Sequence, residues 1–401
     1  MNVDTMRRID HHVGIPLCFL VSGLLWLSRL IRPPRPQSPR RVLFIELSEM
    51  GSPLLDYPAK RRVQTRFPDA QLYFLIFAAN RRSLEITGTV PPGQVLTIRA
   101  DGLGVLVWDT LRAVWAMRRL DLFAAVDLEL FSRYTALLTL LSGAPRRVGF
   151  HRFHNEGLYR GELLTHRVAY NPHQHIAKSF LALVHALAEP AGTTPHTKQA
   201  FADDEIRLDP IRPTEAAREA LRARLLAAFP VLGRAGRWVI LNPNSSELMP
   251  LRRWPVENYL ALGRRLLEQP DTALLLTGTA AEHAEAEAIA QALGDARVVN
   301  LTGFTRMNEL VALYSLVEAM VTNDSGPAHF AAPTGLRTVV LFGPETPALY
   351  GALNPNARFL FAGLACSPCV SAANHRKSAC TDPRCMSAIS VDSVLEQLGR
   401  A

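Results

Sequence analysis

The chain has 401 residues, of which 48% are hydrophobic and 20% charged, so it can form two hydrophobic cores and is not an intrinsically disordered protein. Lys and Arg number 44 against 36 Asp and Glu, and the formal charge of +8 suits a phosphorylated or anionic partner. No basic stretch is interleaved with aromatic residues, which argues against a nucleic-acid-binding protein.

An apolar run with basic flanks lies in the N-terminal segment, residues 1–40. Its centre, Val13 to Ser28, holds sixteen uncharged residues and is followed by Arg29. As a helix it would measure about 24 Å, at about 1.5 Å per residue. This length is short of the roughly 30 Å hydrocarbon core of a bilayer. Three arrangements stay open: the helix spans with help from its Arg flanks, lies in the membrane plane, or packs on the protein's own core.

The sequence favours a membrane-associating helix followed by a stiff Pro/Arg linker, because leucines recur in the run near helical spacing. A cleavable signal peptide is not favoured, since the Arg- and Pro-rich stretch after the run offers no small-residue cleavage site. The basic flank would stay in the cytoplasm. This predicts a location at the cytoplasmic face of the inner membrane.

Two successive alternations of strand-like and helical patterns follow the linker. Residues 41–47, 71–77 and 122–130 are typical of buried strands, and 175–189 of a long helix before a polar boundary stretch. A second alternation begins with the strand that ends at Leu241. The predicted fold class is α/β, with two Rossmann-like doubly wound domains, 41–200 and 201–401, that face a cleft. Ligands of such folds bind at the C-terminal ends of the strands.

One polar turn follows a buried strand in the second alternation. It lies in the stretch TNDSGPAHF, residues 322–330. Asp324 or Ser325 would cap the next helix, and Gly326 would let the backbone approach a ligand closely. His329 follows on the same turn, which capping alone does not explain.

Other strand-end loops of the second alternation carry groups suited to a phosphate-bearing ligand. The loop after Leu241 combines amides and hydroxyls with Arg252, whose guanidinium presents a fork to two phosphate oxygens. These loops supply further candidate ligand-binding residues: Asn244, Ser245, Ser246, Thr277, Gly278, Glu282, Thr302 and Gly303.

These motifs carry a family resemblance. The stretch TNDSGPAHFAAPTGLRTVVLFGPETP, together with RRWPVENYLALGRRL and SGAPRRVGF, resembles glycosyltransferase family 9, the heptosyltransferase family of lipopolysaccharide core assembly. The similarity runs from about Arg41 to Leu398. It implies the GT-B architecture, an N-terminal domain that binds the acceptor and a C-terminal domain that binds a nucleotide-sugar donor. It also implies transfer with inversion of the anomeric centre and no metal in catalysis.

The resemblance implies roles for the C-terminal donor-binding residues. Asp324 would hold sugar hydroxyls, while Ser325, Gly326 and His329 would face the donor diphosphate and sugar. Ser245 and Ser246 lie where the family places hydroxyls against phosphate. Arg252 lies where a lysine usually neutralises the leaving diphosphate, and Glu282 where an acidic residue contacts the ribose.

The first loop departs from the family pattern. Ser52 stands where the family has an aspartate that takes the proton from the acceptor hydroxyl, and a serine hydroxyl is too weak a base near neutral pH. Glu49 in the same loop is the first candidate for a relocated base, and Asp56, one turn into the next helix, is the second. An acceptor that supplies its own base and a protein without catalysis remain as further alternatives.

Four of the five cysteines lie within twenty residues near the C-terminus. Their spacing, C-x2-C-x10-C-x4-C, is typical of a structural zinc site with four thiolates, which would leave no open position for catalysis. Two disulfides or free thiols are the alternatives, and a reducing cytoplasm disfavours the disulfides. The residues are Cys366, Cys369, Cys380 and Cys385; the fifth, Cys18, is expected to be a small buried side chain.

The sequence therefore predicts a membrane-associated GT-B glycosyltransferase. It would move a sugar, heptose by family default, from a nucleotide-diphosphate donor to a lipid-linked saccharide such as lipopolysaccharide core. The alternative is a nucleotide-sugar-binding scaffold or pseudoenzyme in surface-polysaccharide assembly. The absent carboxylate at Ser52 favours this alternative, and the intact block from Asp324 to His329 favours the enzyme.

Overall fold

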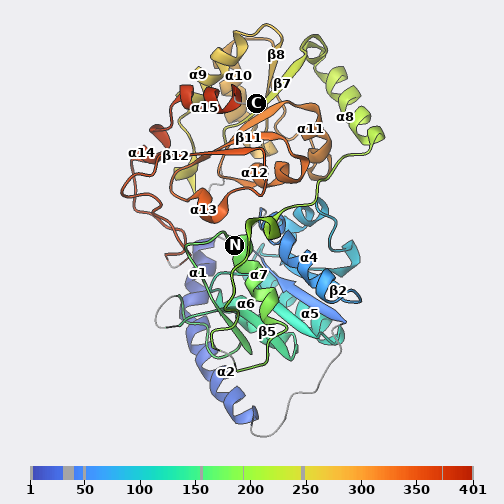
Figure 1. Ribbon diagram of the computed structural model, residues 1–401, viewed down its shortest axis with the longest axis vertical. Coiled ribbons are helices and arrows are strands. Elements are labelled where there is room, and N and C mark those ends of the chain that lie inside the picture. The colour runs from blue at the N-terminus through green and yellow to red at the C-terminus, as the bar shows by residue number, and fades with distance from the viewer. Residues whose placement is uncertain are drawn as a thin grey trace. The chain divides into compact units, whose positions relative to one another are not determined.

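The computed structural model describes residues 3–29, 40–47, 51–153, 157–192, 194–244, 249–372 and 374–399. The chain divides into two compact units, Met1–Ile206 and Arg207–Ala401 (Figure 1). Each unit is built on a six-stranded sheet in which all pairs of neighbouring strands are parallel. The predicted α/β class is therefore confirmed.

The sheet of the first unit has the strand order β3-β2-β1-β4-β5-β6. The chain leaves β1 toward one edge and later returns to its other side at β4, which makes the ends of β1 and β4 the switch point where such sheets bind ligands. The strands are β1 Arg41–Ile45, β2 Gln71–Phe77, β3 Val95–Ile98, β4 Ala124–Asp127, β5 Arg146–His151 and β6 His166–Ala169.

Helices cover both faces of this sheet. The crossovers from β1 to β2 and from β3 to β4 run in opposite directions, so right-handed connections place α4 on one face and α5 and α6 on the other. α4 packs against α7 on the first face, and α5 packs against α6 on the second (Figure 1). The helices are α3 Ser52–Leu55, α4 Tyr57–Arg66, α5 Leu103–Arg119, α6 Arg133–Leu141 and α7 Ile176–Ala186.

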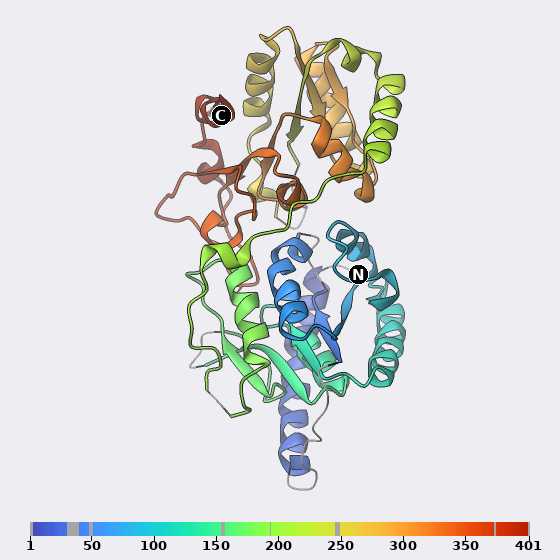
Figure 2. The ribbon, with the colours of Figure 1, turned by 45° about the vertical axis from the view of Figure 1, so that its right-hand side comes forward.

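Two helices precede the first sheet: α1 Val3–His12 and α2 Gly14–Arg29. α2 packs against α6 (Figure 2). Cys18 is fully buried there, as the sequence predicted. In the described part of the chain, no single helix has the length and apolar composition to cross a membrane. α1 and α2 meet the criteria of length and composition only as a pair, bent by 41° at the break between them.

The sheet of the second unit repeats the topology of the first, in the order β12-β11-β10-β7-β8-β9. Its switch point lies between β7 and β10, which pair in parallel. The strands are β7 Arg237–Asn242, β8 Thr272–Leu276, β9 Val298–Asn300, β10 Ala319–Asn323, β11 Arg337–Phe342 and β12 Ala357–Phe361.

One hydrophobic core of the second unit lies between its sheet and the helices on one face. Trp254 and Tyr259 meet edge to face in this core at 5.0 Å between ring centroids, and the indole N–H of Trp254 donates to the carbonyl of Ile389. The helices are α8 Glu215–Ala228, α9 Val256–Leu267, α10 His283–Leu293, α11 Leu310–Leu316, α12 Gly326–Ala331, α13 Pro347–Tyr350, α14 Arg384–Ser387 and α15 Val391–Gly399.

Candidate functional site

The loops after β7 and β10 are locked together at the switch point of the second sheet. Asn323, at the end of β10, is fully buried, and its amide nitrogen donates to the carbonyls of Pro243 and Asn244 at 2.8 and 3.3 Å. Its amide oxygen accepts from the backbone N–H of Trp254 at 3.0 Å. Asn323 is therefore a structural residue that fixes both loops before any ligand binds.

A charged cluster lies at the ends of β10 and β11. The Nε of Arg252 lies 3.4 Å from a carboxylate oxygen of Asp324, and its Nη2 lies 3.1 Å from a carboxylate oxygen of Glu345. Arg376 approaches Glu345 at 3.6 Å. Asp324 and Glu345 are both buried. The structure thus brings together two of the predicted residues, Arg252 and Asp324, and adds a carboxylate that the sequence reasoning missed.

Burial controls the protonation of the two carboxylates. It raises the pKa of Asp324, and the charge of Arg252 opposes the rise. Burial also raises the pKa of Glu345, to about 8, with Arg252 opposing the rise and the like charge of Asp324 adding to it. Near neutral pH Glu345 is therefore mainly protonated and adds little negative charge beside Arg252.

Three predicted residues converge around Gly278, after β8. A Cβ atom built on Gly278 would lie 2.7 Å from the carboxylate of Glu282, 2.9 Å from the amide nitrogen of Asn244 and 3.1 Å from the methyl group of Thr302. A side chain at this point would require the ends of these side chains to shift. Among the described residues, the buried amide nitrogen of Asn244 has no hydrogen-bond partner, so it is a donor available to a ligand.

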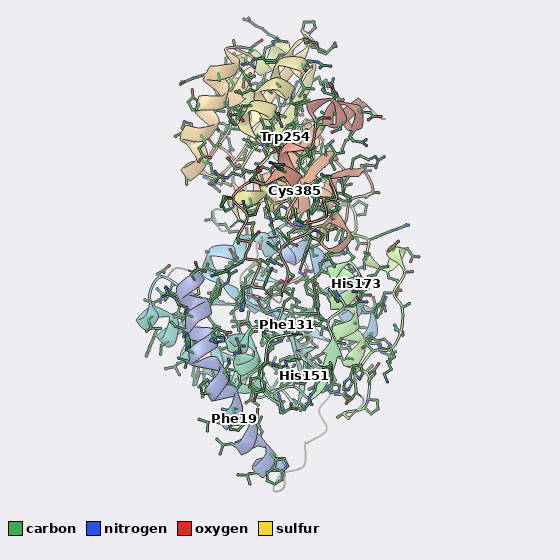
Figure 3. All side chains as sticks on the ribbon, turned by 90° about the vertical axis from the view of Figure 1, so that its left-hand side faces the viewer. Phe19, Phe131, His151, His173, Trp254 and Cys385 are labelled. Carbon is green, nitrogen blue, oxygen red and sulfur yellow. The ribbon has the colours of Figure 1, made fainter. Side chains whose placement is uncertain are left out.

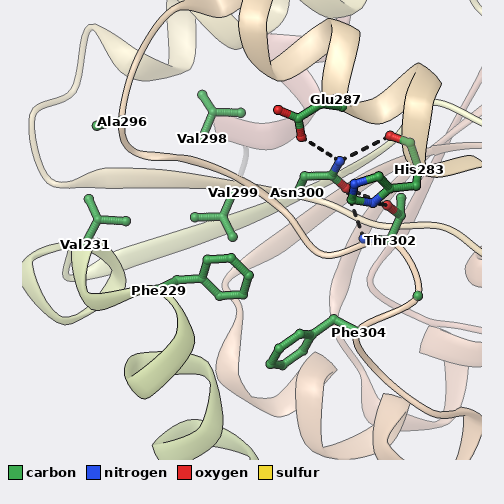
Figure 4. A pocket seen from close by; sticks show the side chains of 11 residues that line it. Phe229, Val231, His283, Glu287, Ala296, Val298, Val299, Asn300, Thr302 and Phe304 are labelled. Carbon is green, nitrogen blue, oxygen red and sulfur yellow. Dashed lines mark hydrogen bonds between the residues drawn. The ribbon is translucent and has the colours of Figure 1, made fainter. Parts of the chain in front are cut away.

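The predicted donor-binding residues near β9 line an open cavity of about 570 Å³. The hydroxyl of Thr302 donates to Asn300 at 2.6 Å and lies 2.9 Å from Nδ1 of His283. Figure 4 shows these side chains on one side of the cavity, with Phe229 and Phe304 on the other. Gly303 also lines the cavity, with a positive φ of 73° that suits glycine.

The predicted cap of the helix after β10 is wrong in its detail. Ser325 occupies the N-cap position of α12, but its side chain makes no capping hydrogen bond. Its hydroxyl donates to the carbonyl of Asn323 at 3.2 Å instead and lies 3.3 Å from the hydroxyl of Thr322. This local contact turns the hydroxyl away from the helix. Gly326 begins the helix, and His329 is buried within it.

Several predicted residues lie outside the described residues. Glu49, Ser245 and Ser246 belong to the undescribed stretches 48–50 and 245–248. Ser52 begins the short helix α3. The roles predicted for these four residues stay predictions. Thr277 is described: its hydroxyl lies within hydrogen-bond reach of the side-chain amide of Asn242, which links the loops after β7 and β8.

Asp56 is poorly placed to act as a base. Its carboxylate is fully buried and lies 2.7 Å from the ammonium of Lys60, which also donates to the carbonyl of Pro53. Burial raises the pKa of Asp56, and Lys60 opposes the rise. A carboxylate enclosed in this way is not accessible to an acceptor hydroxyl, which argues against Asp56 as the relocated base.

Glu129 is an acid at the switch point of the first sheet that the sequence reasoning missed. It follows β4 and is only half-buried, and its carboxylate accepts the backbone N–H of Leu47 at 2.9 Å. Leu47 immediately precedes the first loop, so Glu129 stands beside the loop that lacks the family aspartate. Its neighbour Asp127, by contrast, is fully buried against Arg160. The signal in the sequence was a second acid just after a buried strand.

The four clustered cysteines are near one another but do not form a closed site in the described residues. Cys366 and Cys380 are exposed, Cys369 is half-buried and Cys385 is buried. Burial, with the neighbouring Cys369 and Cys380, raises the pKa of Cys385. No group of three or more His, Cys, Asp or Glu side chains in the described part of the chain is arranged to hold a metal ion. The zinc site stays a prediction.

Two doubly wound domains with the same strand order define the GT-B class of fold. The chain is similar over 89% of its length to the solved structure of E. coli ADP-heptose LPS heptosyltransferase II, with a TM-score of 0.68, 21% identity and 97% of that chain covered. It is also similar to E. coli heptosyltransferase WaaC with ADP, with a TM-score of 0.61, 17% identity and coverage of 89% and 98%.

The family model of glycosyltransferase family 9 (heptosyltransferase) matches residues 131–379, more than half of the chain, and the protein belongs to this family. Over 169 residues it is 32% identical to lipooligosaccharide heptosyltransferase 2 of Haemophilus influenzae. Over 118 residues it is 33% identical to lipopolysaccharide heptosyltransferase 2 of E. coli. The matches cover 40% and 29% of this chain and only 46% and 34% of the two relatives.

Proposed function

We propose that the protein is an inverting glycosyltransferase that moves heptose from ADP-heptose to a lipid-linked saccharide of the lipopolysaccharide core type. The observation that carries the proposal is the grouping of Arg252, Asp324 and the residues around Gly278 at the C-terminal ends of the second sheet. Family membership and the names of the relatives supply the donor and acceptor classes.

The proposed donor roles are those that membership of the family implies, and the charges of these residues are compatible with them. Arg252 pairs with the diphosphate, to which its guanidinium offers a fork of N–H groups, and Asp324 accepts from sugar hydroxyls. Glu282 accepts from the ribose. Ser325, the N-cap residue of α12, and Gly326 and His329 within that helix would face the diphosphate and sugar.

In the proposed reaction the acceptor oxygen loses its proton to a base and forms a bond to the anomeric carbon. The bond from that carbon to the diphosphate breaks, and its electron pair leaves with ADP. Because the nucleophile enters opposite the leaving group, the centre is inverted. Arg252 stabilises the charge that develops on the diphosphate. We propose that no metal ion takes part in this step.

Two carboxylates compete for the role of the base. Glu49 is the candidate from the sequence, because it lies three residues before Ser52. Glu129 is the candidate from the structure, because it is partly exposed and contacts the residue that opens the first loop. Glu129 lies at the switch-point side of the first unit, which we propose as the acceptor domain.

We further propose that the enzyme works at the cytoplasmic face of the inner membrane, where lipid-linked acceptors are presented. One stripe of α2 packs on the first unit, while seven larger apolar residues of α2 and of the break before it are 41–69% exposed. A helix that is apolar around its circumference and docked along one stripe suits the interface of a bilayer. The exposed residues are Val13, Leu17, Phe19, Leu20, Leu24, Trp26 and Leu27.

The test is release of ADP from ADP-heptose in the presence of a heptose-deficient lipopolysaccharide extract. We expect turnover by the wild type and a loss of about 10²- to 10³-fold in kcat for Arg252→Ala, the size typical of removing one charge-stabilising group. Arg218→Ala is the matched control, since Arg218 lies on α8 in surface ion pairs. Tight ADP-heptose binding without turnover would instead support a nucleotide-sugar-binding scaffold, which the absence of a carboxylate at Ser52 favours.

A further inference from the structure

A second apolar surface lies on α5 of the first unit. Five large apolar side chains on one side of this helix are 51–67% exposed, and two of them are tryptophans. Their spacing places them within one face of the helix, opposite the buried Asp109, Ala113 and Met117. We call this set the α5 face: Leu103, Val107, Trp108, Leu111 and Trp115.

The α5 face belongs to the same helix layer as α2. Right-handed crossovers put α5 and α6 on one face of the first sheet, and α2 packs against α6 on that face. α6 is bound to both neighbours: the hydroxyl of its Tyr134 lies 2.5 Å from that of Thr110 on α5, and its Ala136 packs against Cys18 on α2. Packed helices lie about 8–10 Å apart, so α5 and α2 are separated by on the order of 20 Å.

Figure 3 shows α2 in this layer, with Phe19 on the part that extends beyond the sheet. The exposed apolar surfaces of α2 and α5 thus lie on either side of α6. α2 and α5 together expose three tryptophans. Exposed apolar surface of this extent marks an interaction surface rather than the solvent-facing side of an ordinary helix.

The charge of the first unit selects the partner. Residues 1–206 hold 25 Lys and Arg against 18 Asp and Glu, whereas residues 207–401 hold 19 against 18. Basic residues border the α5 face: Arg112 is exposed, and the guanidinium of Arg119 lies 3.5 Å from the ring centroid of Trp115. Exposed aliphatic groups, interfacial tryptophans and bordering arginines are the combination that binds the surface of an anionic bilayer.

We propose that the α5 face inserts into the interface of an anionic lipid bilayer, so that α5 and α2 hold the first unit on the membrane at two places. Two separated contacts fix the orientation of the unit, which one helix alone does not do. This inference goes beyond the glycosyl transfer and does not depend on it.

The first experiment uses tryptophan fluorescence with vesicles of phosphatidylglycerol and phosphatidylcholine whose acyl chains carry bromine. In the full-length W26F variant the exposed tryptophans are Trp108 and Trp115, because Trp238 and Trp254 are buried. Quenching of W26F fluorescence by the brominated lipid is expected. The variant W26F/W108F/W115F keeps only the buried pair and is expected to show no quenching. Equal quenching of the two variants, or none in either, overturns the proposal.

The second experiment measures binding to the same vesicles by flotation. We expect W108S/W115S to bind about tenfold more weakly than wild type, because it removes the largest apolar groups of the face. The control V256S/F359S changes two partly exposed apolar residues of the second unit and is expected to bind as wild type. Unchanged vesicle binding of W108S/W115S with loss of a dimer in light scattering would assign the face to a second copy of the chain and overturn the proposal. Neither assay contains donor or acceptor, so failure of the transfer reaction leaves both results intact.

Discussion

The guanidinium of Arg252 donates to the buried carboxylate of Glu345 at 3.1 Å, although the two residues are 93 positions apart in the chain. Both lie at the C-terminal side of the second sheet, where the family residue Asp324 shares the same guanidinium. The positive charge available to a diphosphate therefore depends on whether Glu345 is protonated.

We predict that donor binding weakens at alkaline pH. Burial raises the pKa of Glu345 to about 8, so the side chain is mainly neutral below that pH and ionises above it. Ionisation adds a negative charge beside Arg252 and competes with the diphosphate. The KM for the donor should rise between pH 7 and 9 in the wild type and stay level in Glu345→Gln. The kcat measured in the same assays separates this effect on binding from an effect on the chemical step. A parallel rise in both proteins would exclude Glu345 as the titrating group.

The raised pKa of Glu345 also makes the free energy of unfolding depend on pH. A carboxyl whose pKa is higher in the folded protein than its ordinary value of 4.5 binds its proton more tightly when folded. The free energy of unfolding should therefore decrease as the pH rises from about 4.5 to about 8, and Glu345→Gln should remove part of that decrease. Urea unfolding across this range measures the effect.

A methyl group on Gly278 is expected to damage the donor site. The added Cβ would meet Glu282, Asn244 and Thr302 at 2.7 to 3.1 Å, so at least one of these side chains must move. The displaced side chains would include the proposed ligand contacts Glu282 and Asn244, so Gly278→Ala should raise the Kd for ADP by about tenfold, or about 1.4 kcal/mol, in calorimetry. Gly93→Ala is the matched control, because a Cβ there meets no atom within 4 Å. Wild-type affinity in Gly278→Ala would disprove a donor contact at this point.

The identity of the base can be decided by two conservative substitutions. Glu129→Gln keeps an oxygen that accepts the backbone N–H of Leu47, so it preserves the contact and removes the basicity. If Glu129 is the base, kcat falls by about 10²- to 10⁴-fold with little change in the donor KM. Glu49→Gln should then be active, and Glu85→Gln, on an exposed site of the same unit, serves as the control. The reverse result assigns the role to Glu49.

The local pattern of the sequence predicted the strongly apolar strands β1, β2 and β4 of the first sheet, but it missed the interior strand β5 and the edge strand β6. β2 coincides with the predicted strand at 71–77, because a central parallel strand buried on both faces is an almost continuous apolar run. β3 and β12 were not predicted. β3 is only four residues long and mostly half-buried, and β12 exposes two of its five residues, so neither carries that pattern. Their place is set by pairing with β2 and β11.

The proposed donor residues were predicted as single strand-end positions, but their partners were not. Nothing near Arg252 in the sequence indicates Glu345, and nothing near Gly278 indicates that Asn244 and Thr302 surround it. These contacts arise only when parallel strands place their C-terminal ends side by side. The predicted cap by Ser325 failed for a related reason, since nearby oxygens compete for its hydroxyl.

Asp10 is expected to hold the N-terminal helices on the first unit. Its carboxylate accepts the backbone N–H groups of Arg133 and Tyr134 at 3.0 and 2.9 Å and pairs with the guanidinium of Arg133. An acid at a helix N-terminus contributes about 0.5–2 kcal/mol. Asp10→Ala should therefore speed hydrogen exchange in α1 and in the first turn of α6 while β1 to β4 stay protected. Asp4→Ala, which breaks an exposed pair with Arg7, is the control and should leave α6 unchanged.

The last prediction concerns metal content. The thiols of Cys366, Cys369, Cys380 and Cys385 lie in one region, and a tetrahedral zinc site would require them to move closer together than they are here. Elemental analysis of protein purified without chelator should find about one zinc per chain. Iron is measured in the same sample, because four thiolates can also bind iron. Cys380→Ser should lower the metal content and the Tm, because four-thiolate sites stabilise the fold that holds them. Cys18→Ser should keep the metal, since Cys18 is buried between α2 and α6. Metal-free protein with four titratable thiols would refute the zinc site, and metal-free protein without them would point to disulfides.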